Sequence, residues 1–205
     1  ILTGDKKYAH KSAVIIHRIA QIYPAMDYAK QSRYGEMMRA RGEDYPGKIV
    51  NHIWECGLAG SVATSYDYIF DAIDSDTELQ KETGKTGAEI RSFIDANFLE
   101  DAIEAIYDGK IRGNFGMHQR AMVEIGLARQ FGEQKKWFGD LMDKSTWSPQ
   151  MLGLRYALYN EVYRDGFPSE TSPGYNSIWV GSIADYGDLL AHAGQDVFAL
   201  SRTRR

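Results

Sequence analysis

Apolar residues recur at intervals of three, four and seven positions along most of this chain, and that helical period is the feature that most limits its fold. The first segment shows the period in five residues: Tyr8, Val14, Ile15, Ile19 and Ile22. Asp5 stands at the cap position before this segment, and Pro24 follows it. Strand-like alternation is hard to find, and only DVFAL at 196–200 fits either a helical turn or a strand. We therefore expect an all-α protein.

The expected helices are separated by connectors rich in Gly, Pro and polar residues. Their starts fall near residues 5, 48, 88, 115, 149 and 175, which gives about six to eight helices of roughly 12 to 25 residues. Glycines mark four expected helix ends: Gly109, Gly132, Gly166 and Gly194. Ser148 and Pro149 mark one expected start. No motif recurs at a fixed period, so an irregular array or toroid of antiparallel helical hairpins fits better than a tetratricopeptide-type repeat.

The second long helical segment, near residues 49–73, contains a run of small side chains: Gly57, Ala59, Gly60 and Ser61. These residues would let another helix approach closely, because small side chains keep two helix axes near each other. We expect a helix crossing at this point.

Composition and missing motifs exclude several classes of function. The net charge of −4 and the lack of any Lys/Arg run beyond the final RTRR argue against nucleic acid or a membrane as partner. No apolar stretch approaches the roughly 18 residues of a membrane helix. Cys56 is the single cysteine, and the five histidines form no close ligand pair, so we expect no metal and no cofactor. The GKT at 84–86 is not a phosphate loop, because Leu79 stands where that motif needs glycine.

The stretch RGNFGMHQ carries the strongest candidate site. Four polar side chains crowd an expected helix start: Arg112, Asn114, His118 and Gln119. If Asn114 caps this helix, His118 lies on the same face with its Cβ about 5–6 Å away. Free N–H groups and the positive dipole end at a helix start favour a carboxylate, so we expect an anion site. The simpler alternative is a cap alone, which contributes about 1 kcal/mol and needs no ligand.

Two further stretches supply weaker candidates. The connector in DGFPSETSPGYNSIW, rich in Pro, Gly and hydroxyl residues, presents Glu170, Tyr175 and Asn176 at a helix entrance. Ser172 or Thr171 is the expected cap there, and Tyr175 alternatively packs as a rim residue. The stretch NHIWE places Trp54 and Glu55 in a long helix as a possible substrate wall, although such a Trp is usually core and such a Glu usually solvated.

Four stretches occur in an order that resembles the helical domain of heparinase II/III-like polysaccharide lyases, relatives of the oligo-alginate lyases: LTGDKKYAHKSAVIIHRIAQIYP, GKIVNHIWE, RGNFGMHQ and FPSETSPGYN. The likeness covers residues 1–194 and implies an incomplete (α/α) toroid, with 195–205 as a tail or the start of a further domain. In such enzymes a β-sandwich follows the toroid, and the active site lies between the two. In several relatives Asn or Gln stands immediately beside the His, whereas three residues separate Asn114 from His118 here.

The resemblance implies β-elimination on a uronic-acid-containing glycan, an anionic polysaccharide or oligosaccharide. Asn114 and His118 would neutralise the C5 carboxylate as the enolate forms, and such donors contribute about 2.7–4 kcal/mol each in comparable sites. Tyr175 would transfer the protons. Charge would come from Arg112 or Arg155, and six residues are candidates for substrate binding: Arg112, Gln119, Trp54, Glu55, Glu170 and Asn176. No metal or other cofactor is implied.

The chain start and the family together suggest where the protein acts. ILTGDKKYAH lacks the apolar core and cleavage site of a signal peptide, and it enters a helical pattern without Met. We therefore expect a processed, truncated or excised piece whose β-sandwich is missing. A periplasmic or secreted location follows from the resemblance, because the polymeric substrates lie outside the cell.

Two other functions stay open at this point. A glycoside hydrolase on an (α/α) toroid needs two carboxylates about 5–5.5 or 6.5–9.5 Å apart. Glu55, Glu170 and Asp185 are its candidates, and none stands in a persuasive pair. A non-catalytic helical scaffold for glycan or peptide would instead tolerate loss of Asn114 and Tyr175.

Overall fold

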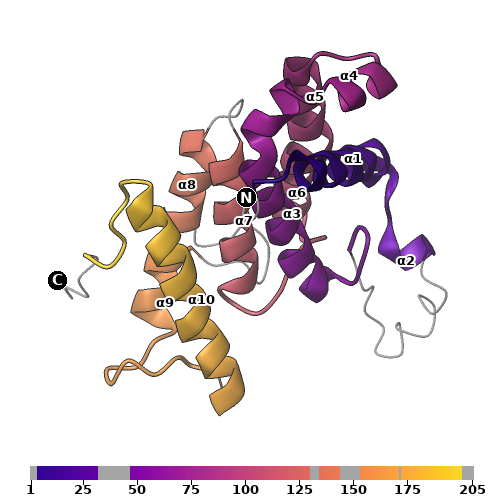
Figure 1. Ribbon diagram of the computed structural model, residues 1–205. Coiled ribbons are helices and arrows are strands. Elements are labelled where there is room, and N and C mark those ends of the chain that lie inside the picture. The colour runs from indigo at the N-terminus through magenta and orange to yellow at the C-terminus, as the bar shows by residue number, and fades with distance from the viewer. Residues whose placement is uncertain (1–3, 32–46, 130–133, 144–152, 171, 200–205) are drawn as a thin grey trace.

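The computed structural model describes residues 4–31, 47–129, 134–143, 153–170 and 172–199 (Figure 1). Within these ranges the protein is helical, and no strand forms. Two isolated antiparallel bridges, Gly47 with Asn51 and Val162 with Pro168, each close a turn. The expectation of an all-α protein is therefore confirmed for the described residues, and DVFAL begins in a turn rather than a strand.

Ten α-helices are described in these ranges: α1 Lys6–Ile22, α2 Tyr28–Gln31, α3 His52–Asp74, α4 Thr77–Thr83, α5 Gly87–Ile94, α6 Asp101–Tyr107, α7 Met117–Ala128, α8 Gln134–Asp143, α9 Leu154–Asn160 and α10 Pro173–His192. A 3₁₀ turn, Tyr23–Ala25, follows α1, and a π-helical segment, Asp95–Glu100, joins α5 to α6. Asp5 caps α1 by accepting from the Lys7 N–H, as expected from the sequence. No described helix has the length and apolar character needed to cross a bilayer.

Helix α7 packs between α3 and α10, and the three helices run in the same direction (Figure 1). On the α3 side, Cys56 lies near Gly113 and Gly60 lies near Ala121, so residue numbers rise in the same direction along α3 and α7, and the two helices are parallel. On the α10 side, Ser182 abuts Gly116 and Asp185 pairs with Arg120. Helices α3 and α7 therefore begin close together, whereas α10 begins further out toward the lower end in Figure 1, because the residue beside Gly116 is Ser182, nine residues after the start of α10.

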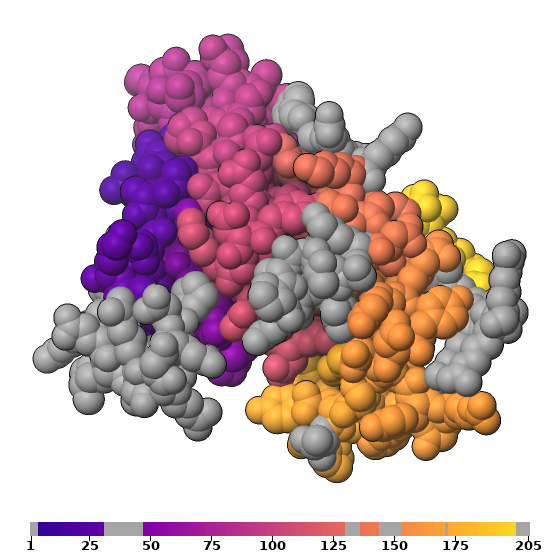
Figure 2. Space-filling view, turned by 180° about the vertical axis from the view of Figure 1, so that it is seen from behind, coloured from indigo at the N-terminus to yellow at the C-terminus, as the bar shows by residue number. Residues whose placement is uncertain are grey.

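The remaining helices cover this layer on both sides. Helices α1 and α5 pack on α3, while α8 and α9 follow α7 toward the other side. Seen from behind in Figure 2, the N-terminal half and the α8–α10 half lie on opposite sides of the molecule. One apolar core runs through both halves, and its largest fully buried aromatic side chains are Tyr23, Tyr66, Phe98 and Tyr186. Burial of each such side chain contributes about 1.5–3 kcal/mol.

Gly60 lies at the crossing of α3 and α7, as the run of small residues predicted. A Cβ at this position would meet the Glu124 carboxylate, the movable end of a flexible side chain, and would lie in ordinary contact with the Ala121 backbone, so a small residue here lets α3 and α7 approach closely. Gly57 behaves differently, because it is exposed and has open space around it.

Several predicted helix boundaries shift in the structure. The helix expected to end at Gly166 stops at Asn160, because residues 162–168 fold back into a bridged turn. The expected start at Ser148 and Pro149 and the expected end at Gly132 lie outside the described residues. Gly109 and Gly194 adopt positive φ angles of 75° and 83° just after α6 and α10, as expected for helix ends.

Candidate functional site

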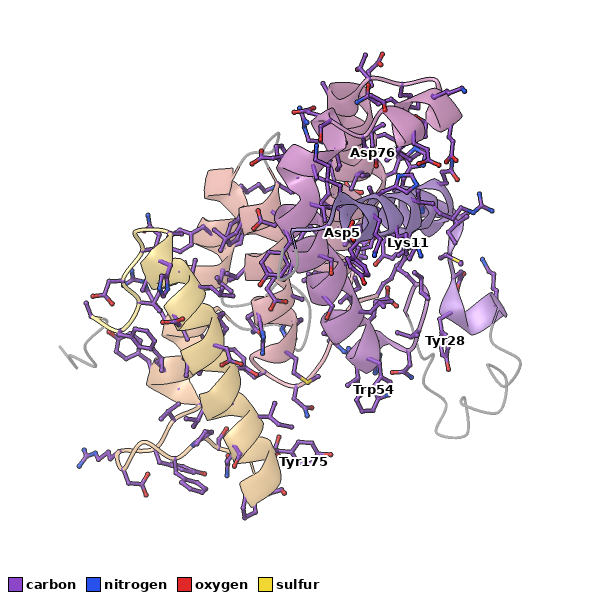
Figure 3. The ribbon with its side chains drawn as sticks, in the orientation of Figure 1. Asp5, Lys11, Tyr28, Trp54, Asp76 and Tyr175 are labelled. Atoms are coloured by element: carbon purple, nitrogen blue, oxygen red, sulfur yellow. The ribbon has the colours of Figure 1, made fainter. Side chains whose placement is uncertain are left out.

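The end of the molecule where α3, α7 and α10 begin carries the residues that the sequence singled out. Trp54, in the first turn of α3, is 71% exposed, and Tyr175, in the first turn of α10, is 48% exposed. Both project from this same end (Figure 3). The neighbouring N-termini of α3 and α7 each carry a partial positive charge of about half an elementary unit. The end is therefore electrostatically suited to an anionic ligand.

The loop between α6 and α7 bridges the starts of α3 and α10. The Arg112 N–H donates to the His52 carbonyl oxygen over 3.2 Å at the beginning of α3. On the other side, the Phe115 ring stacks on Trp179 of α10 with centroids 4.2 Å apart. Asn114 lies between these two attachments, and its side chain is partly exposed. The loop thus holds Asn114 at the end of the molecule that Trp54 and Tyr175 share.

Asn114 is not the helix cap, which corrects the sequence prediction. Helix α7 begins at Met117, and Gly116 occupies the cap position with a φ of 98°. A side chain at Gly116 would collide with Ser182 of α10, so the close approach of α10 also requires glycine there. The Gly116 N–H donates to the Gln119 Oε1 over 2.8 Å, and Gln119 therefore performs the capping role. Asn114 and His118 do not share one helix face.

His118 is fully buried in the described structure. Its Nδ1 lies 3.2 Å from the Gly113 carbonyl oxygen and 3.4 Å from the Gly113 nitrogen. Burial lowers the pKa of His118 to about 3; the backbone contact with Gly113 opposes this, and the charge of Arg112 adds to it. The imidazole is therefore neutral near neutral pH. It supports the backbone beside Asn114 and does not face solvent.

Trp54 and Glu55 reverse the usual expectation for their types. Glu55 is 0% exposed, whereas its neighbour Trp54 points to solvent. The Glu55 carboxylate accepts from the Tyr23 hydroxyl over 3.0 Å and from the Val50 N–H over 2.7 Å. Burial raises the pKa of Glu55, and these hydrogen bonds oppose the shift. Glu55 thus secures the turn before α3 and is not a substrate wall, whereas Trp54 remains accessible.

The connector before α10 is tied down by Asn176. This residue is buried, and its Nδ2 donates to the Glu170 carbonyl oxygen over 3.1 Å. Ser172 occupies the cap position as predicted, although its side chain makes no cap hydrogen bond. Thr171, the alternative cap, lies outside the described residues. Asn176 therefore supports the connector, and the adjacent Tyr175 is the residue that reaches solvent.

A groove of about 400 Å³ with both polar and apolar lining residues follows α7 away from this end, between α3 and α10. Its lining residues are Cys56, Gly57, Ser61, Met117, Arg120, Ala121, Glu124, Ile178 and Ser182. Arg120 bridges the groove, because it pairs with Glu124 over 2.9 Å and with Asp185 over 2.6 Å. Sequence reasoning missed Arg120 and Glu124, although their i,i+4 spacing beside His118 signals a charged face on α7.

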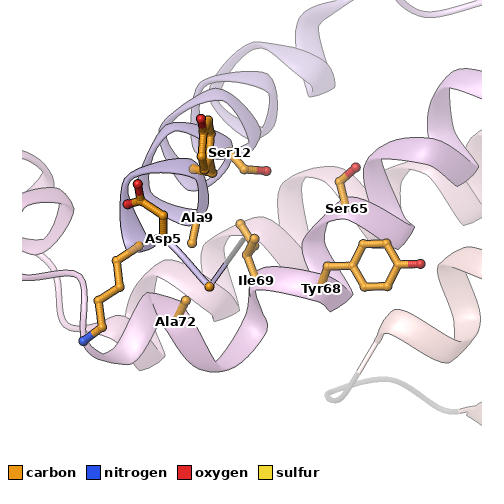
Figure 4. Close-up of a pocket in the computed structure, with 10 residues that line it drawn as sticks. Asp5, Ala9, Ser12, Ser65, Tyr68, Ile69 and Ala72 are labelled. Carbon is orange, nitrogen blue, oxygen red and sulfur yellow. The ribbon is translucent and has the colours of Figure 1, made fainter. Parts of the chain in front are cut away.

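A larger cavity, about 720 Å³, lies elsewhere, between the start of α1 and the second half of α3 (Figure 4). Its walls are mostly apolar, with Ala9 and Ser12 from α1 facing Ser65, Tyr68 and Ile69 from α3. None of the candidate residues lines it. The larger cavity therefore does not coincide with the candidate functional residues.

Two of the three carboxylates that a hydrolase could use have partners within the protein. Glu55 is buried and bonded to Tyr23 and to backbone, and Asp185 is engaged by Arg120. Among the residues that the structure describes, no group of three or more His, Cys, Asp or Glu side chains could hold a metal ion.

Arg155, the alternative source of positive charge, pairs with Asp143 over 2.8 Å on the α8–α9 side of the molecule. Arg112, in the loop that carries Asn114, is the cation next to the candidate site. Comparisons of this chain with models of protein families, with curated proteins and with solved structures found no match.

Proposed function

We propose that this chain is the helical part of a polysaccharide lyase, which cleaves uronic-acid-containing glycans by β-elimination. The observation that carries the proposal is the placement of Asn114. Its loop is attached to α3 through Arg112 and to α10 through Phe115, at the end where Tyr175 is exposed. The family resemblance of the sequence names the reaction, and this arrangement supports it.

Electrostatics at this end favour a substrate that carries carboxylates. The N-termini of α3 and α7, which lie beside the Asn114 loop, each stabilise a nearby anion by about 0.3–1 kcal/mol at exposed sites. Arg112 adds a full positive charge in the loop that carries Asn114. A uronate carboxylate placed against Asn114 would therefore be held by a cation, an amide donor and helix dipoles.

In this scheme Asn114 stabilises the developing negative charge, and Tyr175 transfers the proton. The Asn114 amide donates to the C5 carboxylate and stabilises the negative charge that develops when the C5–H bond breaks. Tyr175, acting as a phenolate, accepts that proton, the C4=C5 double bond forms, and the C4–O bond breaks. Tyr175 then returns the proton to the expelled C4 oxygen, and no water enters the product. Trp54, exposed at the same end, offers a flat surface for a neighbouring sugar ring.

His118 has a positioning role in this scheme. It is neutral and buried, and it contacts the Gly113 backbone one residue before Asn114. Gln119 plays a comparable part, because its side chain holds the Gly116 N–H at the start of α7. Both residues keep the loop in one conformation, which a preorganised donor requires.

The incomplete toroid is part of the proposal. Parallel neighbours α3, α7 and α10 resemble an inner wall, and the intervening helices resemble an outer layer. The starts of the inner helices would then line the substrate-binding end. A β-sandwich domain outside this chain would close the cleft, and secretion or periplasmic export would bring the enzyme to its polymer.

The test is product formation, measured as the ultraviolet absorbance of the unsaturated uronate with alginate, heparan, chondroitin and ulvan in turn. Asn114→Ala should reduce the turnover by about 10²–10³-fold, as loss of an oxyanion donor does elsewhere. Tyr175→Phe should reduce it by about 10²–10⁴-fold. Tyr8→Phe removes a hydroxyl from another exposed tyrosine, on α1, and should leave turnover unchanged. Full turnover in Asn114→Ala overturns the proposal, and so does absence of product with all four polymers when the β-sandwich domain is present.

A further inference from the structure

Exposed aromatic side chains gather on the segment from α9 to the first turn of α10. Five large apolar residues are exposed there, and all are aromatic: Tyr156, Tyr159, Tyr163, Phe167 and Tyr175. No large aliphatic side chain is exposed in the described part of 154–175. Aromatic surface left in water is costly, and contiguous patches of it mark binding sites.

The turn between α9 and α10 presents two of these rings from a pinned backbone. The Tyr163 N–H donates to the Phe167 carbonyl oxygen over 2.8 Å, and the Gly166 N–H donates to the Tyr163 carbonyl oxygen over 3.0 Å. The Ser169 N–H donates to the Glu161 carbonyl oxygen over 2.7 Å, and Gly166 takes the positive φ of 87° that the turn needs. These bonds order the turn without burying the rings.

Pairing in this turn places Tyr163 and Phe167 side by side. The bridge between Val162 and Pro168 sets the register, so Tyr163 stands opposite Phe167. Opposite residues have Cβ atoms about 4.5–5.5 Å apart and share one face. Burial agrees with this alternation: Pro168 is buried, whereas Tyr163 is 61% exposed and Phe167 is 52% exposed. The turn thus offers an aromatic pair on its solvent side.

The turn between α9 and α10 carries a positive charge that could bind an anion. Arg164 is exposed beside Tyr163 and forms no ion pair with any described residue. The neighbouring acids have other partners: Asp165 accepts from the Phe167 N–H over 3.0 Å, and Glu161 accepts from the Ser169 hydroxyl over 2.8 Å. Arg164 therefore remains available to a carboxylate from outside.

We propose that the aromatic turn, Tyr163 to Phe167 with Arg164, is a second binding surface for an anionic glycan chain. A pyranose ring has an apolar C–H face that stacks on aromatic rings, and a tyrosine hydroxyl or an arginine can bind the polar rim. The absence of exposed large aliphatic side chains from the described part of 154–175 favours sugar over a protein partner, whose interface cores combine both kinds. The choice of a uronate-bearing glycan rests on the proposed function.

The surface continues toward the candidate site through the connector. Asn176 holds the end of the connector against α10, next to Tyr175. In Figure 1 this segment lies beside the start of α10, at the end where Figure 3 shows Tyr175. A polymer bound at Tyr175 could therefore reach the aromatic turn, which would hold the long chain while leaving the chemistry of a short one unchanged.

The test is migration of the whole chain through native gels that contain alginate or neutral dextran. The double variant Tyr163→Ala/Phe167→Ala should bind alginate about tenfold more weakly, a loss typical of truncated aromatic anchors. The matched control is Tyr8→Ala/Tyr68→Ala, which removes two exposed tyrosines from α1 and α3 and should bind normally. Unaltered thermal unfolding of both variants shows that the fold is intact.

The outcomes separate this surface from the proposed reaction. If Tyr163→Ala/Phe167→Ala binds alginate normally, or if dextran retards the protein equally, the second surface is refuted even where Asn114→Ala abolishes turnover. If the double variant loses binding while no unsaturated product forms from any polymer, the surface stands and the lyase proposal fails. For an active enzyme, cleavage of a short oligosaccharide should survive the double substitution. No binding of the unsubstituted chain to alginate also overturns the surface.

Discussion

Phe115 stacks on Trp179 with ring centroids 4.2 Å apart, and this contact fixes the α6–α7 loop to α10. Asn114 directly precedes Phe115, and Tyr175 lies one helical turn before Trp179. The two residues assigned to the chemistry therefore depend on one aromatic contact between segments far apart in the sequence.

Phe115→Leu should weaken this attachment without unfolding the protein. Loss of the aromatic pair should lower the free energy of unfolding by about 0.5–1.5 kcal/mol, which urea titration can measure. Turnover should fall as well, because the loop that carries Asn114 is no longer fixed against α10. The matched control is Phe70→Leu, which removes an edge-to-face contact with Tyr66 on α3. Full turnover in Phe115→Leu, despite a measured stability loss, would refute the positioning role of the stack.

A buried ion pair connects the π-helical segment to the end of α7. The Arg129 guanidinium donates to both Asp95 carboxylate oxygens, over 2.9 and 3.2 Å, and both side chains are buried. Asp95→Ala leaves the guanidinium without this partner, so we expect a loss of about 3–5 kcal/mol in the free energy of unfolding.

The pair between Arg120 and Asp185 is the control for this prediction. It joins α7 to α10 over 2.6 Å, but both side chains are about half exposed. Asp185→Ala should therefore cost only about 0–1 kcal/mol. Urea titration of Asp95→Ala and Asp185→Ala measures the loss in the free energy of unfolding of each variant. Equal losses would show that burial of the ion pair does not determine this loss.

Helical periodicity predicted most elements because it reports which face of each helix is apolar, and that pattern is local. The predicted start of α7 was wrong by two residues for a non-local reason. Asn114 is a good cap by type, but the approach of Ser182 on α10 requires glycine at position 116. Gln119, three positions later, then performs the cap hydrogen bond.

The candidate site was predictable in part. Sequence motifs indicated Asn114 and Tyr175, and both are accessible at one end of the molecule. They did not indicate which polar residues are buried. Glu55 faces inward because Tyr23 and the backbone before α3 surround its carboxylate, and that environment forms only on folding. Arg120 was missed because its significance depends on Asp185 from another helix.

Two helical glycines should respond in opposite ways to alanine. Gly126 in α7 faces Trp137 of α8, and a Cβ there would collide with the indole ring. Gly126→Ala should therefore cost about 1–3 kcal/mol through overpacking. Gly181 in α10 is exposed with open space around it, so Gly181→Ala should stabilise the protein by about 0.5–1 kcal/mol through helix propensity. Melting temperatures test both, and a stabilised Gly126→Ala would contradict the close packing of α7 on α8.

His118 should make the protein less stable as the pH falls. Burial, with a smaller effect from Arg112, lowers its pKa to about 3, whereas an unfolded histidine has an ordinary value of about 6.5. Between these values the unfolded chain binds the proton and the folded protein does not, so acid favours unfolding. Each pH unit below 6.5 should cost about 1.4 kcal/mol, or about 2 kcal/mol between pH 7 and pH 5. His118→Gln removes this dependence, and urea titrations of both proteins at the two pH values measure it.

His10 provides the control with the opposite sign. Its Nδ1 lies 2.9 Å from an Asp76 carboxylate oxygen, and this hydrogen bond raises its pKa. The stabilisation by this pair is fully present below the unfolded pKa of about 6.5 and is lost as the pH rises through the folded value. The stability lost on His10→Gln should therefore be greater at pH 5 than at pH 8, whereas the His118 contribution weakens toward acid. If His118→Gln leaves the dependence between pH 5 and pH 7 unchanged, His118 is not a neutral, buried residue in solution, and its proposed support of the Asn114 loop fails with it.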